Sequence, residues 1–124
     1  MRVSTCQRMD HALIGTGFPD RYMNHFPAYM KTFTAIFDQS GGIRRAGAAA
    51  LDLAYVASGR LDGFWELKLE AWDLAAGILL IQEAGGLISN LQGKPIEHGD
   101  VIAGNPTIHK KILAILDGAL LIHA

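Results

Sequence analysis

The sequence has little that would mark a secreted, membrane-spanning or nucleic-acid-binding protein. Cys6 is the only cysteine, which excludes an internal disulfide. No window reaches the roughly 18 uninterrupted apolar residues that a membrane span needs, and the first residues do not form a secretory signal. With 11 Lys and Arg against 12 Asp and Glu, the net charge of −1 gives no attraction to nucleic acid or to an anionic membrane. We therefore expect a soluble protein without either partner, and the cytoplasm is its default compartment.

Familiar catalytic motifs are missing as well. The five histidines lack the spacing of a zinc site, and no serine lies in a Gly-x-Ser-x-Gly elbow. Neither Gly15-Thr-Gly17 nor Gly85-Gly86 completes a nucleotide-binding glycine motif, so we interpret both as turns. Arg44 and Arg45 fit solvated side chains better than a contact with an acid across a subunit boundary.

What is present suits one folded domain spanning residues 1–124. Hydrophobic residues make up 50% of the chain and charged residues 19%, a composition that supports a core. The mean hydropathy of +0.20 is high for so short a chain. Because a small domain cannot easily hide that much apolar surface by itself, we expect a large interface.

Predicted strands and helices alternate along the chain. Short apolar runs predict strands at 12–15, 43–44, 64–66, 87–89 and 101–103. Longer segments predict helices at 24–39, 47–58, 73–83 and from Pro106 onward, with Asn105 as the N-cap of the last. The alternation predicts an α/β fold, a layered αβα domain with helices on both faces of a mixed sheet of about five strands.

The most informative stretch covers residues 72–86. Asp73 stands where a long apolar run begins, and Gly85-Gly86 closes that run. A buried helix with a carboxylate at its positive end marks a place where a metal-bound phosphate could be held. Glu66, Glu70 and Asp73 fall within eight residues, close enough to point into one cleft. The alternatives are a first-turn acid that stabilises its helix for Asp73 and a solvated strand-end acid for Glu66.

Residues 72–86, together with 43–66, closely resemble the C-terminal half of the inositol monophosphatase family, particularly its bacterial extragenic-suppressor (SuhB-like) branch. The resemblance covers nearly the whole chain. It implies one domain of a two-domain, Mg²⁺-dependent phosphomonoesterase whose first half supplies a glutamate and an Asp-Pro-(Ile/Leu)-Asp-Gly-Thr motif. No Asp-Pro dipeptide occurs here. We therefore expect the N-terminal metal- and phosphate-binding domain to be absent, no complete catalytic set, and no activity of this chain alone.

The resemblance also implies roles for individual residues. Asp73 matches the family's aspartate ligand of Mg²⁺, and most of the other ligands come from the missing half. Glu66 matches a glutamate that accepts a hydrogen bond from an inositol hydroxyl. Gly47, Ala48 and Ala49 match the stretch that lines the sugar pocket, where small side chains let the ring approach the backbone. Ala48 lacks the hydroxyl that is usual at its position.

Two residues depart from the family pattern near Asp73. Lys68 stands at a glycine position and Ala71 at a proline position. Losing the glycine strains the loop if a positive φ is required there. Losing the proline leaves the unfolded loop with more freedom and loosens the approach to Asp73.

The implied ligand is an inositol phosphate, and the implied protein partner is a second copy in a homodimer or the missing N-terminal domain. One alternative is a noncatalytic interaction module whose interface for that domain is free to pair. Another keeps the phosphatase fold but acts on fructose bisphosphates or 3′-phosphoadenosine nucleotides. The Glu66 and Trp72-Asp73 context favours the inositol phosphate.

Overall fold

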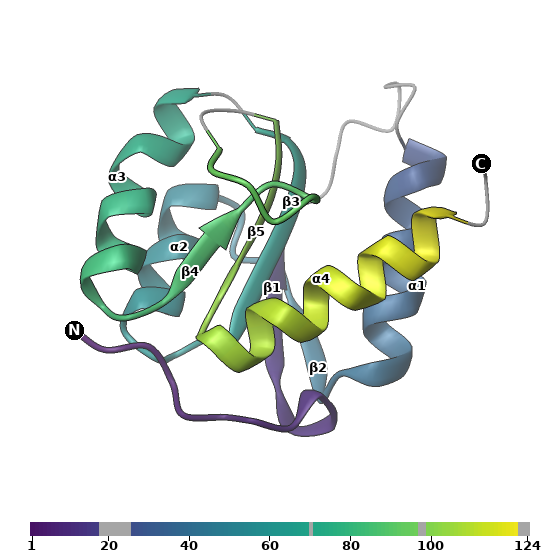
Figure 1. Cartoon of the computed structure of the whole chain (residues 1–124), viewed down its shortest axis with the longest axis horizontal. Helices are drawn as coiled ribbons and strands as arrows, with labels where there is room; N and C mark the ends of the chain where they lie inside the picture. Colours follow the sequence, from purple (N-terminus) through teal and green to yellow (C-terminus); the bar gives the residue numbers. More distant parts are fainter. Residues whose placement is uncertain (18–25, 70, 97–98, 122–124) are drawn as a thin grey trace.

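The described part of the chain folds as a sheet flanked by helices on both faces (Figure 1). The computed structural model describes residues 1–17, 26–69, 71–96 and 99–121, without the side chains of 71–73 and 121. Its five strands and four α-helices confirm the predicted layered α/β fold with a mixed sheet. Within these ranges no helix has the length and apolar character needed to cross a membrane.

The strands lie in the order β2-β1-β3-β5-β4. β1 runs parallel to β2 and to β3, whereas β5 runs antiparallel to β3 and β4. All five predicted strands are confirmed, and β3 extends three residues beyond its predicted end. Their bounds are β1 Leu13–Thr16, β2 Gly42–Arg44, β3 Gly63–Leu69, β4 Leu87–Ser89 and β5 Gly99–Gly104.

The helices also agree with the sequence pattern. Asn105 is the N-cap of the last helix as predicted, because its Oδ1 accepts the Ile108 N–H at 2.8 Å. A short 3₁₀ helix at Met9–His11 was not predicted. The predicted start of the first helix at Asn24 lies outside the described residues. The α-helices are α1 Phe26–Gln39, α2 Ala49–Ala57, α3 Ala71–Glu83 and α4 Pro106–Leu121.

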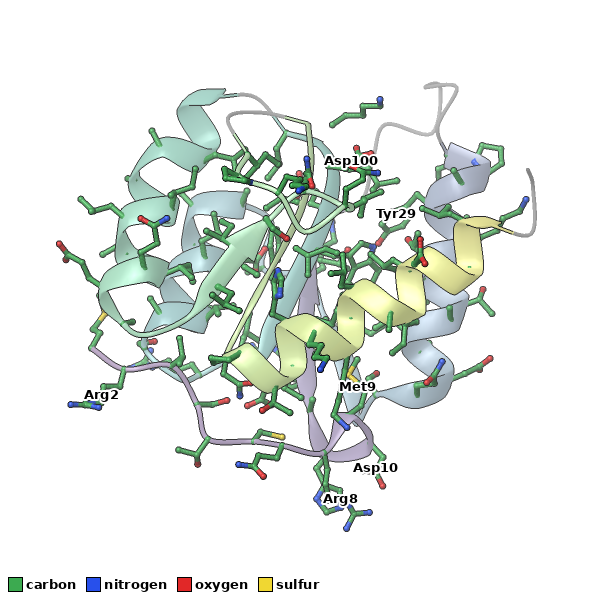
Figure 2. All side chains as sticks on the ribbon, viewed as in Figure 1. Arg2, Arg8, Met9, Asp10, Tyr29 and Asp100 are labelled. Atoms are coloured by element: carbon green, nitrogen blue, oxygen red, sulfur yellow. The ribbon has the colours of Figure 1, made fainter. Side chains whose placement is uncertain are left out.

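One side of the sheet, which we call the α1/α4 face, has an aromatic core. Side chains alternate along a strand, so β3 directs Trp65 to this face and Phe64 to the other. Trp65 stacks on Tyr29 with ring centroids 6.0 Å apart, and its Nε1 donates to the Thr32 hydroxyl at 2.9 Å. The Tyr29 hydroxyl lies 3.0 Å from that of Thr16, so Tyr29 joins α1 to the sheet (Figure 2).

The opposite side, which we call the α2/α3 face, has an aliphatic core. Phe64 packs there with Leu53 of α2 and with Leu74 and Ile81 of α3, all with no exposed surface. Gly77 of α3 faces Leu53, and a Cβ on this glycine would collide with that side chain. The absence of a side chain therefore lets the two helices approach closely.

Three strand ends meet at one edge of the sheet. Because β1, β2 and β3 are mutually parallel, the residues that follow each strand leave the sheet on the same side. Gly17 follows β1, Arg45 follows β2, and α3 begins after β3 with only residue 70 between them. In α/β proteins the crevice beyond the carboxyl ends of parallel strands is the usual position of a ligand site.

Candidate functional site

A cavity of about 350 Å³ lies at this edge. The segments after β1 and β2, the start of α2 and the far half of β3 all contribute to its walls. Four residues predicted from the sequence line it together, namely Glu66, Gly47, Ala48 and Ala49. The remaining lining residues are Gly17, Arg45, Ala50 and Leu69.

Glu66 occupies its place because its neighbour on β1 has no side chain. The parallel register pairs Thr16 with Trp65, which puts Gly17 next to Glu66. A Cβ on Gly17 would collide with the Glu66 carboxylate. Glu66 is partly buried. The pKa of the Tyr29 hydroxyl is raised to about 12, mainly by burial, and the negative charge of Glu66 adds to this increase.

The start of α2 forms a wall of backbone and small side chains. Gly47 has φ +95°, a conformation that L side chains rarely adopt, and Ala48 is extended with φ −147° and ψ 127°. Ala48 is the N-cap of α2 and makes no side-chain capping bond, because alanine lacks the hydroxyl usual in the resembled family. The wall therefore presents peptide groups and methyl groups to the cavity.

Lys68 adopts a backbone conformation with positive φ, the case in which the loss of the family's glycine strains the loop. Its φ is +63°, so the position at which the resembled family has glycine does require a positive φ here. The pairing of β3 with β5 shifts register between Glu66 and Leu69, and the Lys68 N–H donates to Asp100 Oδ1 at 3.1 Å. Asp100 lies at the end of the molecule opposite Arg8 and Asp10 (Figure 2).

Asp73 is the third residue of α3 and so lies in its first turn. Its side chain and the whole of Glu70 are outside the described residues, and the predicted metal-ligand role of Asp73 stays a prediction. Among the side chains that are described, no three His, Cys, Asp or Glu come together as a group that could hold a metal ion. The described side chains therefore do not form a Mg²⁺ site by themselves.

Four cavity residues were not predicted from the sequence, namely Gly17, Arg45, Ala50 and Leu69. Arg44 and Arg45 are exposed as predicted, but Arg45 also lines the cavity. The interpretation of Gly15-Thr-Gly17 as a turn is wrong, because Gly15 and Thr16 belong to β1 and Gly17 lines the cavity directly after it. Two of these omissions have a signal in the sequence, since Gly17 and Arg45 each lie just after a predicted strand. The turn at Gly85-Gly86 is confirmed by φ +86° at Gly85.

These features define a layered α/β domain with a ligand-sized cavity at the carboxyl ends of parallel strands. A family model described as "Inositol monophosphatase family" matches residues 1–120, and the chain belongs to this family. The match confirms the family that the sequence motifs indicated.

Individual relatives agree with the family match. The chain is 48% identical over 120 residues to "Nus factor SuhB" of Pseudomonas aeruginosa, covering 94% of this chain and 44% of that protein. It is 44% identical over 118 residues to "Inositol-1-monophosphatase" of Rhizobium meliloti, with the same two coverages. The crystal structure of extragenic suppressor protein suhB from Bartonella henselae superposes with a TM-score of 0.87 at 43% identity, over 93% of this chain and 45% of that one. The chain thus spans less than half the length of these relatives.

Proposed function

We propose that this chain is the C-terminal, substrate-binding part of a Mg²⁺-dependent phosphomonoesterase that acts on inositol monophosphates. The observation that carries the proposal is the shared cavity, in which Glu66 faces the small-residue wall of Gly47, Ala48 and Ala49. The name of the Rhizobium meliloti relative supports the substrate class.

The cavity has the chemistry that a polyol phosphate needs. In our proposal the Glu66 carboxylate accepts a hydrogen bond from a ring hydroxyl, a contact strengthened by its charge. The wall from Gly47 to Ala49 lets the ring approach the backbone, and Leu69 supplies an apolar contact for its C–H groups. Arg45 adds a positive charge at the rim that favours an anionic ligand. These groups bind and orient the substrate.

We assign Asp73 as a metal ligand by the same resemblance. Asp73 is the third residue of α3, which begins two residues after β3 ends at Leu69 of the cavity. This place in the first turn suits a group that acts beside the bound phosphate. When bound, Mg²⁺ supplies charge neutralisation on the phosphate oxygens and an activated water. One carboxylate does not complete an octahedral site. The other ligands would come from the part of the relatives' length that this chain does not cover, so the chain alone is not a complete catalyst.

Ligand binding and turnover test the two parts of the proposal separately. Titration of the chain with myo-inositol 1-phosphate should show binding that weakens about tenfold or more in Glu66→Gln, because a hydrogen bond to a charged group contributes roughly 1.5–3 kcal/mol. Glu83→Gln, at the exposed end of α3, is the matched control and should bind like the unmodified chain. Equal affinity of Glu66→Gln and the control would contradict the substrate role.

Turnover should be absent when this chain alone is assayed with excess Mg²⁺ and myo-inositol 1-phosphate. Hydrolysis that disappears in Asp73→Asn and needs no added partner would show that the site is complete, contrary to the proposal. Stronger binding of 3′-phosphoadenosine or of fructose bisphosphate than of the inositol phosphate would move the assignment to a related phosphatase.

A second candidate is a noncatalytic interaction module that pairs with another subunit. The observation in its favour is an apolar groove of about 650 Å³ between α1 and α4, lined by Met30, Ala35 and Ala119 among others. Nearby on α1, Phe37 is 61% exposed. Light scattering separates the two candidates, since a monomer that binds no apolar dye would argue against an exposed interface.

A further inference from the structure

The end of β3 that lines the cavity departs from a regular strand. Glu66 pairs with Val101 of β5. The next pair along the ladder is Leu69 with Gly99, so three steps on β3 match two steps on β5. β3 therefore has one extra residue here, which is the arrangement of a β-bulge, and Lys68 within it has φ +63°. The residues on both sides of the bulge, Glu66 and Leu69, line the cavity.

The bulge changes the face of the sheet to which Leu69 belongs. Side chains alternate along a regular strand, and this rule holds for Phe64 on the α2/α3 face and for Trp65 and Leu67 on the α1/α4 face. Continued alternation would put Leu69 on the α1/α4 face with Leu67. Leu69 packs instead in the α2/α3 core with Phe64, and it lines the cavity together with Glu66. The extra residue thus brings an apolar side chain and a carboxylate to the same cavity.

Asp100 holds this bulge from the neighbouring strand β5. Its Oδ1 accepts the backbone N–H of Lys68 at 3.1 Å, so a side chain supplies an acceptor where the ladder is irregular. A carboxylate is a stronger acceptor than a neutral group, and the bond offsets part of the cost of the positive φ at Lys68. Asp100 is not among the described residues that line the cavity. It therefore acts on the cavity through the shape of β3.

We propose that Asp100 is a positioning residue of the binding site, which holds the Lys68 bulge and thereby places Leu69 beside Glu66 against the ring of the ligand. This inference rests on the proposed function and deepens it, because it assigns the shape of one cavity wall to a residue that does not touch the ligand. An inositol ring carries both hydroxyl and C–H groups. Glu66 binds a hydroxyl and Leu69 covers C–H groups, so affinity depends on the two side chains lying together.

Titration with myo-inositol 1-phosphate tests the hydrogen bond from Asp100. Asp100→Ala should weaken binding about tenfold, the size of change that follows when one apolar group of a pocket is displaced. Asp100→Asn keeps an acceptor oxygen without the charge and should stay within about twofold of the unmodified chain. Asp117→Ala, at an exposed aspartate of α4, is the matched control and should bind like the unmodified chain. Asp100→Ala binding like this control, or Asp100→Asn binding as weakly as Asp100→Ala, would overturn the positioning role.

Lys68 offers a second test in which Asp100 stays in place. Lys68→Gly adopts the positive φ without strain, so the bulge remains and the affinity should be unchanged. Lys68→Val has a branched Cβ that makes a positive φ a rare outlier, so this variant should bind about as weakly as Asp100→Ala. Equal affinities of the glycine and valine variants would show that the bulge does not set ligand binding.

A double-mutant cycle separates the placement of Leu69 from a general loss of structure. Leu69→Ala should itself weaken binding of myo-inositol 1-phosphate. Adding Asp100→Ala to it should then change the affinity by less than about twofold, because the side chain that Asp100 places is gone. Additive losses would overturn the positioning role and leave the proposed function standing. If the unmodified chain fails to bind myo-inositol 1-phosphate, the proposed function is overturned, and this inference with it.

Discussion

His109 on one face of the sheet and Asp52 on the other are both buried titratable side chains, but they differ in their hydrogen bonding. On the α1/α4 face, His109 of α4 is 6% exposed and its Nε2 lies 2.7 Å from the Ser89 hydroxyl. On the α2/α3 face, Asp52 is 1% exposed and its Oδ1 has no partner. Burial lowers the pKa of His109 and raises that of Asp52, because it disfavours the charged form of each.

Hydrogen bonds satisfy most of the buried polar side chains that the structure describes. The Thr16–Tyr29, Thr32–Trp65 and Ser89–His109 pairs satisfy polar side chains on the α1/α4 face, although the Ser40 hydroxyl after α1 is buried without a partner. Asp52 keeps an unsatisfied oxygen. Asp52 is therefore the buried ionisable group that the fold leaves partly unsatisfied, at a cost to stability.

The largest expected effect is the loss of the aromatic core on the α1/α4 face. Trp65→Ala should lower the free energy of unfolding by about 3–5 kcal/mol, because it leaves a cavity and removes the contacts with Tyr29 and Thr32. Urea unfolding at pH 7.5 measures the change. Phe37→Ala is the exposed aromatic control and should stay within about 0.5 kcal/mol. A loss below about 1 kcal/mol for Trp65→Ala would contradict the account of this face.

The second-largest effect is expected on the α2/α3 face, where Asp52→Asn removes the buried carboxyl and changes the pH dependence of stability. The carboxyl has a pKa of about 6 in the fold against 3.8 as its ordinary value, so its contribution to stability is fully present below pH 3.8 and is lost as the pH rises through 6. The variant should therefore gain on the unmodified chain between pH 4 and pH 7.5, by up to about 3 kcal/mol. Urea unfolding across this range measures the gain. A difference that is constant with pH would show that the buried charge carries no cost.

The third effect concerns His109 on the α1/α4 face, where the dependence of stability on pH runs in the opposite direction to that of Asp52. Burial lowers the pKa of His109, so the unfolded state takes up the proton more readily and the His109 contribution to stability is lost as the pH falls below about 6.5. His109→Gln should remove this dependence in thermal unfolding curves. Ser89→Ala should cost about 1–2 kcal/mol at pH 7.5, because it leaves the His109 ring nitrogen buried without its partner. Unchanged pH dependence in His109→Gln would refute the assignment.

The smallest effect concerns Lys68 at the cavity edge. Lys68→Gly should raise the free energy of unfolding by about 1 kcal/mol, because glycine adopts φ +63° without the clash of a Cβ. Lys94→Gly is the control, since Lys94 is an exposed loop lysine without a positive φ. It should be neutral or destabilising. Destabilisation by Lys68→Gly would mean that the lysine side chain contributes more than its backbone strain costs.

The sequence was sufficient for the strand and helix order, because glycine-bounded apolar runs and helical spacing identify elements locally. It also identified four residues that line the cavity, through the resemblance. It could not show that Asp52 turns toward Gly15, since a single acid between Leu51 and Leu53 fits either an exposed or a buried side of α2. The fit of Glu66 against Gly17 could not be found either, because it depends on the parallel register of β1 and β3, whose paired residues, such as Thr16 and Trp65, lie far apart along the chain.

In the proposed function, Glu66 and the wall from Gly47 to Ala49 form one ligand site. A residue-resolved map of amide chemical shifts during titration with myo-inositol 1-phosphate tests it most directly. The account predicts that the shifts concentrate at Gly17 and at residues 47–50, and that Gly17→Ala abolishes them because the added methyl group displaces the Glu66 carboxylate. Shifts confined to the groove between α1 and α4, or shifts that persist unchanged in Gly17→Ala, would contradict it.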